Sequence, residues 1–275
     1  MSHNNQKKIA LINDFSGFGR CSLTVALPII SAMKIQCCPI PTSIFSNHSG
    51  YDSFYFEDFT AHMQKYIDEW KKLKLEFSGI CTGFLGSEEQ IDIVTEFIAA
   101  FGKKDTIVVV DPVMGDNGVA YATYTDGMCK RMKELSALAD IVTPNLTEAC
   151  ILAEKEYRED YSLSKIEEIA KIICERGSKK VVISGILKGQ YMTNFCYSSD
   201  GGATIIKTKK IGAQRAGTGD VFSSIIAADA VNGVPFEASV RKASNFVKKC
   251  IAKSEEMKIP TEDGVVFEEF LCKLK

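Results

Sequence analysis

The chain has 275 residues, with 33 Lys and Arg against 35 Asp and Glu, 45% hydrophobic residues and 25% charged residues. This balance is typical of a globular protein and excludes a disordered or collagen-like chain. Because the charges are interspersed and the net charge is −2, we expect no basic surface for nucleic acid.

Neither a sorting signal nor a membrane anchor is predicted. Residues 1–8 are polar, and the first apolar stretch, residues 9–12, ends at Asn13 and Asp14. No run approaches the roughly 20 apolar residues that a spanning helix needs. The ten cysteines include no CxxC pair, and with three histidines the chain lacks zinc-ligand spacing. We therefore expect a cytoplasmic protein with reduced, mostly buried thiols and no membrane partner.

Short β-branched segments alternate along the chain with longer segments of helical period. The predicted strands cover residues 9–12, 77–82, 106–110, 140–142 and 181–184, and the predicted helices cover residues 23–33, 56–73, 88–101, 125–138, 166–176, 221–232 and 236–254. This alternation predicts an α/β fold with a mainly parallel sheet covered by crossover helices.

The stretch after the last predicted parallel strand breaks this rhythm. Residues 191–197 and 204–211 flank a turn that contains Gly201 and Gly202, so an antiparallel hairpin is predicted at the edge of the sheet. No internal repeat and no Pro/Gly-rich linker is present. Residues 1–275 are therefore predicted to form a single domain.

Polar residues follow the predicted strands at their carboxyl ends, where ligands collect in parallel sheets. These ends read Asn13-Asp14, Thr82-Gly83-Phe84, Asp111-Pro112, Thr143-Pro144-Asn145 and Ser184-Gly185.

The sharpest local motif is Gly217-Thr218-Gly219-Asp220, directly before an apolar helical segment. Two glycines let the backbone fold tightly, and the start of a helix favours an anion. Residues 217–219 would then cradle a phosphate, and Asp220 could accept a proton from a hydroxyl group that attacks it in line. An aspartate that caps the helix after a Gly-rich turn explains the motif equally well.

Two further motifs follow predicted strands. Asp111 and Asp116 lie five positions apart around a turn and could share a hydrated Mg²⁺, although an ordinary Asp-rich loop has the same composition. Thr147 and Glu148 open the helix after Thr143-Pro144-Asn145, and Glu148 could equally be a partner of the helix dipole. The P-loop pattern GxxxxGK[ST], GxGxxG and GxSxG are all absent.

In this order and spacing, the motifs resemble those of the ribokinase-type small-molecule kinases, and within them the pyridoxal (vitamin B6) kinases. The match is carried by the stretches FSNHSGY at 45–51, DPVMGD at 111–116, TPNLTE at 143–148 and GTGD at 217–220. The resemblance implies a ribokinase-like three-layer α/β/α fold and ATP-dependent phosphorylation of the 5′-hydroxymethyl group of pyridoxal, pyridoxine or pyridoxamine. It also implies Mg²⁺, a monovalent cation such as K⁺ and a homodimer.

The resemblance assigns a role to each matched residue. Asp220 would be the base on the substrate hydroxyl. Gly217, Thr218 and Gly219 would form the anion hole for the γ-phosphate. The remaining residues would contact the nucleotide (Asn145, Ser184, Asp111 and Glu148), the Mg²⁺ region (Asp111, Asp116 and Glu148) and the pyridine ring (Asp14, Ser49 and Phe84).

Two positions depart from the family pattern. Asp14 stands where many B6 kinases carry a serine, and Phe84 stands where they carry a tyrosine. Phe84 keeps an aromatic face without the hydroxyl, and Asp14 could favour a substrate with a protonated amine or ring nitrogen.

Two alternatives remain open. Hydroxymethylpyrimidine, a sugar or a nucleoside could occupy the same kinase pocket, because the fold and the GTGD motif do not separate these substrates. A non-catalytic B6-binding protein could retain the fold, but it would have no need for the clustered carboxylates Asp111, Asp116, Glu148 and Asp220.

Overall fold

The protein is built around a nine-stranded sheet. The computed structural model describes residues 2–275 and orders the strands β11-β10-β9-β8-β5-β4-β1-β2-β3. Their bounds are β1 Lys8–Phe18, β2 Gln36–Asn47, β3 Phe56–Asp58, β4 Gly79–Thr82, β5 Ile107–Val110, β8 Ile141–Val142, β9 Lys180–Lys188, β10 Tyr191–Ser198 and β11 Gly202–Lys209. Strands β2, β1, β4, β5, β8 and β9 are parallel, and both edges are antiparallel. A small ribbon, β6 (Gly115–Asp116) and β7 (Val119–Ala120), stands apart.

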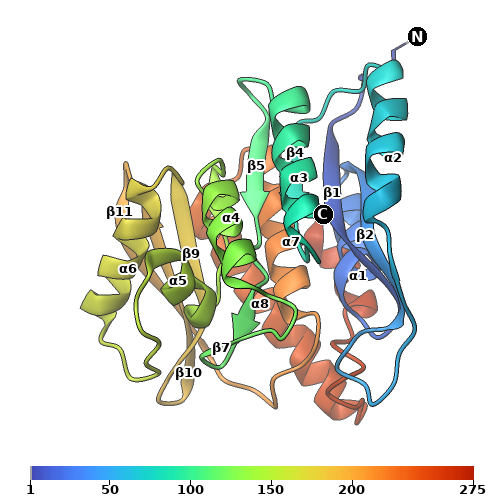
Figure 1. Cartoon of the computed structure of the whole chain (residues 1–275). Coiled ribbons are helices and arrows are strands. Elements are labelled where there is room, and N and C mark those ends of the chain that lie inside the picture. Colours follow the sequence, from blue (N-terminus) through green and yellow to red (C-terminus); the bar gives the residue numbers. More distant parts are fainter. Residues whose placement is uncertain (1) are drawn as a thin grey trace.

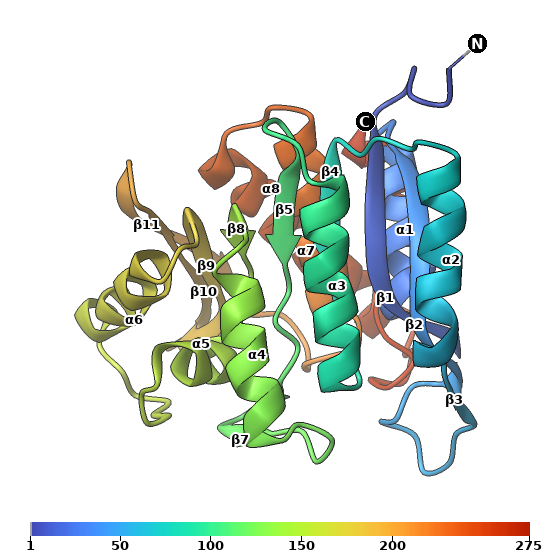
Figure 2. The ribbon, with the colours of Figure 1, turned by 45° about the horizontal axis from the view of Figure 1, so that its top comes forward.

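Helices cover both faces of the sheet, as Figure 1 and Figure 2 show. One face carries α2 Thr60–Lys72, α3 Glu88–Phe101, α4 Asp126–Ser136, α5 Leu146–Ala153 and α6 Leu163–Glu175, and the other carries α1 Ser22–Ala32, α7 Thr218–Val231 and α8 Phe236–Glu256. The last segment, Glu268–Leu274, is a 3-10 helix that packs on α1. The predicted three-layer α/β/α architecture is confirmed.

The core lies in two layers because the central strands are apolar on both faces. In β1, Ala10 and Ile12 face the layer under α2 to α6, whereas Ile9 and Leu11 face the layer under α1, α7 and α8. Continuous apolar runs of this kind are what a parallel sheet buried on both sides requires.

The predicted edge hairpin is confirmed as β10 and β11, paired from Tyr191 with Lys209 to Ser198 with Gly202. The opposite edge differs from the prediction. Residues 56–58, predicted as the start of a helix, form strand β3, where Phe56 pairs with Phe45. The helix begins only at Thr60, whose N–H donates to Asp58 Oδ1 over 2.7 Å.

Strand β2 was not predicted, because Pro39 and Pro41 interrupt its pattern. Over these prolines β2 has β1 as its neighbour on one side only, since β3 pairs with residues 43–45. A missing N–H therefore removes no ladder hydrogen bond there.

The cysteines and the helix lengths are both subjects of the sequence predictions. All ten cysteines are free thiols, and six of them are buried. Within residues 2–275, no helix is long and apolar enough to cross a membrane.

Candidate active site

The site forms where the carboxyl ends of β1, β4 and β5 meet the first turn of α7. Asn13, near the end of the buried part of β1, joins these elements through its side chain. Its Nδ2 donates to Asp220 Oδ1 over 3.1 Å, and its Oδ1 accepts from the N–H groups of Phe84 at 2.8 Å and Asp14 at 2.9 Å. The structure therefore brings Asp14, Phe84 and Asp220 around one buried amide.

The first turn of α7 carries the glycines of the GTGD motif. Gly217 is the N-cap at φ +71°, and a Cβ there would lie 1.8 Å from the carbonyl oxygen of Arg20. Gly219 is exposed, and a Cβ added to it would meet nothing within 4 Å among residues 2–275. Gly217 is thus required by the backbone, whereas Gly219 faces open space in front of the helix N-terminus.

The back of this turn is built from both ends of the chain. Gly264 lies at φ +84°, and a Cβ there would be 2.8 Å from the Arg20 carbonyl oxygen. The N–H of Arg20 donates to Asp263 O over 3.1 Å, and the N–H of Ala216 donates to Thr261 O over 3.2 Å. The segments around residues 20, 216 and 263 therefore hold one another.

Asp220 does not cap its helix. The cap position is Gly217, with no side-chain cap bond among residues 2–275, and the Asp220 carboxylate turns to Asn13. Its half-buried position and the nearby charge of Asp14 raise its pKa to about 6, while the N–H of Ser22 and the Asn13 amide act in the opposite direction. A carboxyl group with this pKa can take a proton near neutral pH.

Asp111, at the end of β5, faces the same space. Burial and, second, the charge of Asp220 raise its pKa to about 7, and the hydroxyls of Ser223 and Thr143 oppose this shift. Two carboxyl groups, one from β5 and one from α7, therefore share a poorly hydrated region. Such a pair is stabilised when a cation binds next to it.

Asn145 and Glu148 form a capping box at the start of α5. The N–H of Asn145 donates to Glu148 Oε2 over 2.8 Å, and the N–H of Glu148 donates to Asn145 Oδ1 over 2.9 Å. The other atoms of both side chains hold the 111–116 loop: the N–H of Met114 donates to Glu148 Oε1 and Asn145 Nδ2 donates to Gly115 O. Burial, and then Asp111, raise the pKa of Glu148 well above its ordinary value.

The carboxylates of the site could hold Mg²⁺ only in part. Among residues 2–275 no group of three or more His, Cys, Asp or Glu side chains is arranged to hold a metal ion. Glu148 accepts two backbone N–H groups, and Asp116 accepts from Asn117 and Gln214. Asp111 has the freest carboxylate of the three. These residues fit an ion held by one or two carboxylates, waters and substrate phosphates, which is a common arrangement for Mg²⁺.

The other predicted residues lie around this centre at different depths. Ser184 lies next to Asn145, since its N–H donates to Pro144 O over 2.8 Å and the two residues form a parallel bridge. Asp14 is buried and accepts from Ser16 Oγ over 2.9 Å, and burial raises its pKa. Ser49 is exposed on the loop after β2. The neighbouring His48 anchors that loop through its Nε2, 2.7 Å from Glu262 O.

Arg215, two residues before the GTGD motif, carries a charge next to the phosphate cradle but is not exposed to it. Its guanidinium group is buried, with Nη1 donating to Ile259 O and Pro260 O and Nη2 pairing with Glu255 over 2.8 Å. It ties the GTGD turn to the segment after α8.

Sequence reasoning gave Asn13 no role in the site. One signal could have pointed to it: Gly83, directly after β4, leaves no room for a side chain, because the Asn13 carboxamide occupies that space, 2.4 Å from where a Cβ would be. A glycine after a buried strand indicates that another group approaches closely.

A parallel sheet whose strand ends face a glycine-lined helix start, with a carboxylate beside it, defines a ribokinase-like kinase. The chain belongs to the phosphomethylpyrimidine kinase family, whose profile matches residues 30–266.

Relatives of two specificities are similar to the chain. A candidate phosphomethylpyrimidine kinase from Bacteroides thetaiotaomicron, crystallised with pyridoxal, is 36% identical, covers 98% of this chain and 96% of its own, and superposes with a TM-score of 0.94. A hydroxymethylpyrimidine/phosphomethylpyrimidine kinase from Aquifex aeolicus is 26% identical over 90% of both chains. A pyridoxine/pyridoxal/pyridoxamine kinase from Bordetella avium is 25% identical over 90% of this chain and 86% of its own.

Proposed function

We propose that the protein transfers the γ-phosphoryl group of ATP to the 5′-hydroxymethyl group of a vitamin B6 vitamer. The observation that carries the proposal is the Asp220 carboxylate, which Asn13 holds beside the open side of Gly219 and which shares the Asn13 amide with the backbone N–H of Phe84. A hydroxyl group bound next to Asp220 would face both a base and a helix N-terminus that accepts phosphate.

Phosphoryl transfer needs alignment and charge stabilisation more than covalent help. Asp220 takes the proton of the attacking hydroxyl at a carboxylate oxygen, and Asn13 Nδ2 fixes the orientation of that carboxylate through Oδ1. The backbone around Gly217 and Gly219 receives the negative charge that develops on the phosphoryl group. Mg²⁺ held by Asp111 and the substrate phosphates would neutralise part of the same charge.

The choice of a B6 vitamer rests on two supports. The Bacteroides relative at 36% identity was crystallised with pyridoxal, and the stretch at 45–51 resembles that of B6 kinases. The backbone N–H groups of Asp14 and Phe84 both donate to Asn13 Oδ1, so the two residues meet at one strand end, where an Asp14 carboxylate could pair with a protonated amine or ring nitrogen.

Hydroxymethylpyrimidine or its phosphate is the second candidate substrate. The family profile and the Aquifex relative favour it, and the chemistry at Asp220 would be the same. The decisive measurement compares kcat/KM for pyridoxal, pyridoxine, pyridoxamine and hydroxymethylpyrimidine with ATP and Mg²⁺. We expect at least about a tenfold preference for one of the B6 vitamers, and a preference for the pyrimidine would contradict the proposal.

Replacing Asp220→Asn tests the proposed base. Turnover should fall about 10²- to 10⁴-fold, because the amide cannot accept the proton. The Kd for ATP, measured by calorimetry, should change little. A variant with near-normal turnover would remove Asp220 from this role, and vitamer binding without ATP consumption by the unaltered protein would indicate a carrier.

We also propose that the protein is a homodimer, is located in the cytoplasm and is activated by K⁺. The homodimer is supported by exposed apolar side chains at the sheet edge formed by β1, β2 and β3, which we call the aromatic edge. It consists of the exposed residues Phe15, Phe18, Ile44, Phe54, Tyr55 and Phe56. Exposed apolar surface of this kind marks interaction sites.

A further inference from the structure

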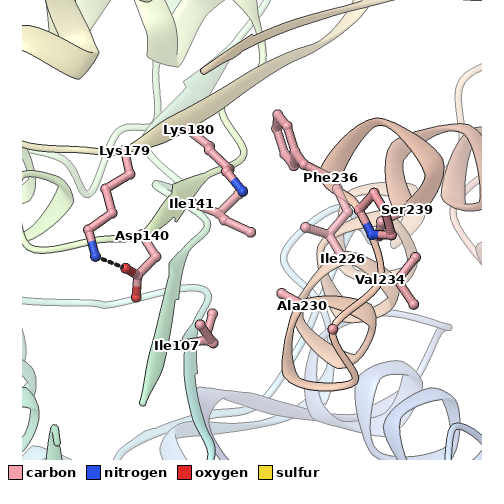
Figure 3. Close-up of a pocket in the computed structure, with 12 residues that line it drawn as sticks. Ile107, Asp140, Ile141, Lys179, Lys180, Ile226, Ala230, Val234, Phe236 and Ser239 are labelled. Carbon is pink, nitrogen blue, oxygen red and sulfur yellow. Dashed lines mark hydrogen bonds and ion pairs between the residues drawn. The ribbon is translucent and has the colours of Figure 1, made fainter. Parts of the chain in front are cut away.

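A pocket of about 340 Å³ lies at the opposite end of the sheet from Asp220. It is formed by the amino ends of β5, β8 and β9 on one side and by the turn from α7 into α8 on the other (Figure 3). Ile107 and Ile141 contribute apolar surface from the strands, and Ile226 and Phe236 contribute it from the helices, with Val234 in the turn between them. Nothing in the proposed kinase chemistry uses this pocket, because α7 runs from the GTGD turn at one end of the sheet to Ala230 at the other.

The cations of the pocket are Lys179 and Lys180, and they differ in how they are used. Lys179 Nζ is 2.6 Å from Asp140 Oδ1 in an ion pair on the outer side of Ile141 (Figure 3). Lys180 has no ion pair with any residue in the range 2–275, and its Nζ lies 5.8 Å from the centroid of the Phe236 ring. Two lysines against one aspartate leave the lining with an excess of one positive charge.

The third polar feature is the start of α8. This helix of 21 residues begins at Phe236 after Pro235, and among the described residues no side chain caps it. Ser239 in its first turns lines the pocket and is 2% exposed, yet its Oγ has no hydrogen-bond partner within residues 2–275. A buried hydroxyl without a partner is unfavourable unless a ligand or water satisfies it.

We infer that this pocket binds a small organic anion with a compact apolar body. The body lies against Ile226 and Phe236, and the carboxylate or phosphate group is held by Lys180 and the N-terminus of α8, with Ser239 Oγ as a hydrogen-bonding group. An apolar lining with a few convergent polar groups is typical of small-molecule sites. A helix N-terminus and an unpaired lysine favour a negative charge on the ligand.

The test uses the intact protein and NMR titration of backbone amides with four probes: benzoate, phenyl phosphate, benzyl alcohol and inorganic phosphate. Benzoate or phenyl phosphate should bind saturably and shift the amides of Gly233, Phe236 and Ser239. Benzyl alcohol and inorganic phosphate, which lack the charge or the apolar body, should bind at least about tenfold more weakly. The tighter of the two anions identifies the head group.

Two variants and a control make the result specific. Lys180→Met should weaken binding of the better probe about tenfold, whereas Lys179→Met, which removes an exposed and already paired charge, should change it less than about twofold. Ser239→Ala should weaken binding without lowering the Tm of the ligand-free protein, because the hydroxyl it removes has no partner. Shifts confined to Gly217 and Gly219, equal losses in both lysine variants, or no saturable binding would each overturn the inference.

Discussion

The carboxamide of Asn13 connects β1, the segment after β4 and the start of α7. Its oxygen accepts two backbone N–H groups and its nitrogen donates to Asp220. Because the oxygen is fixed by Phe84 and Asp14, the nitrogen has only one direction in which to donate. Asn13 is therefore a positioning residue for the proposed base.

Asn13→Ala should move the acid limb of the kinase pH profile. The Asn13 amide lowers the pKa of Asp220, so its removal should raise that pKa above about 6. Asp220 acts as a base only when it is deprotonated, and kcat/KM should then rise at a higher pH than in the unaltered protein. Asn232→Ala is a matched control, because the Asn232 amide lies at the other end of α7 from Asp220 and donates to Met33 O. Superimposable pH profiles for Asn13→Ala and the parent would contradict the positioning role.

Gly217 and Gly219 should respond differently to the same added methyl group. Gly217→Ala places a Cβ at a positive φ and against the Arg20 carbonyl, so the free energy of unfolding should fall by at least about 2 kcal/mol. Gly219→Ala meets open space, so the Tm should not fall, but the KM for ATP should rise because the methyl group occupies the proposed cradle. Urea denaturation and steady-state kinetics measure the two effects. A Gly219→Ala variant with unchanged KM would place the phosphate elsewhere.

At the scale of elements, α5 and the 111–116 loop stabilise each other through Glu148. Both carboxylate oxygens accept backbone N–H groups, one from the helix cap and one from Met114. The side chain predicted from the resemblance to lie in the Mg²⁺ and nucleotide region thus also holds the loop that carries Asp116.

Glu148→Ala should therefore lower the free energy of unfolding by about 1–3 kcal/mol, since the buried Met114 N–H loses its acceptor. Urea denaturation without Mg²⁺ measures this effect, and Glu148→Gln, which keeps one carbonyl oxygen, should fall in between. If Glu148 acts only on the metal, the urea midpoint will stay unchanged and the Mg²⁺ concentration for half-maximal activity will rise.

The elements differ in how readily the sequence predicts them, and the difference depends on how far their signals are local. Helix α3 is predicted residue for residue because Ser87 caps it and its apolar residues keep one period. Strand β2 is missed because Pro39 and Pro41 interrupt its pattern, and the start of α2 is misplaced because residues 56–58 pair with β2, Phe56 with Phe45. Local pattern contains no information about such a partner.

The residues of the candidate site also differ in how readily the sequence predicts them. Asp111, Phe84 and Asp220 stand in recognisable positions after strands or before a helix, and the structure brings them to one end of the sheet. Asn13 and Arg215 each contact residues more than 40 positions away, Asn13 with Asp220 and Arg215 with Ile259. Their partners are set by the packing of the whole chain.

At the scale of the whole molecule, the aromatic edge is the surface expected to join two copies. Phe15 and Ile44 are paired in register on β1 and β2, and both are exposed. Ile44→Lys should therefore convert the predicted dimer into a monomer of about 30 kDa in light scattering after gel filtration, because a buried charge without a partner is unfavourable. Leu138→Lys, at an exposed position between α4 and β8, is the control. A dimer that withstands Ile44→Lys would place the interface on another face.

The packing of Arg20 and Gly264 behind the GTGD turn has a consequence for biosynthesis. Gly217 packs against the carbonyl of Arg20, and Gly264, near the C-terminus, packs against the same residue. A nascent chain can complete most of its sheet while its tail is still inside the ribosome, but its phosphate-binding turn lacks support until Gly264 has emerged. Premature termination shortly before that codon should thus yield a polypeptide with all of its strands and no competent nucleotide pocket.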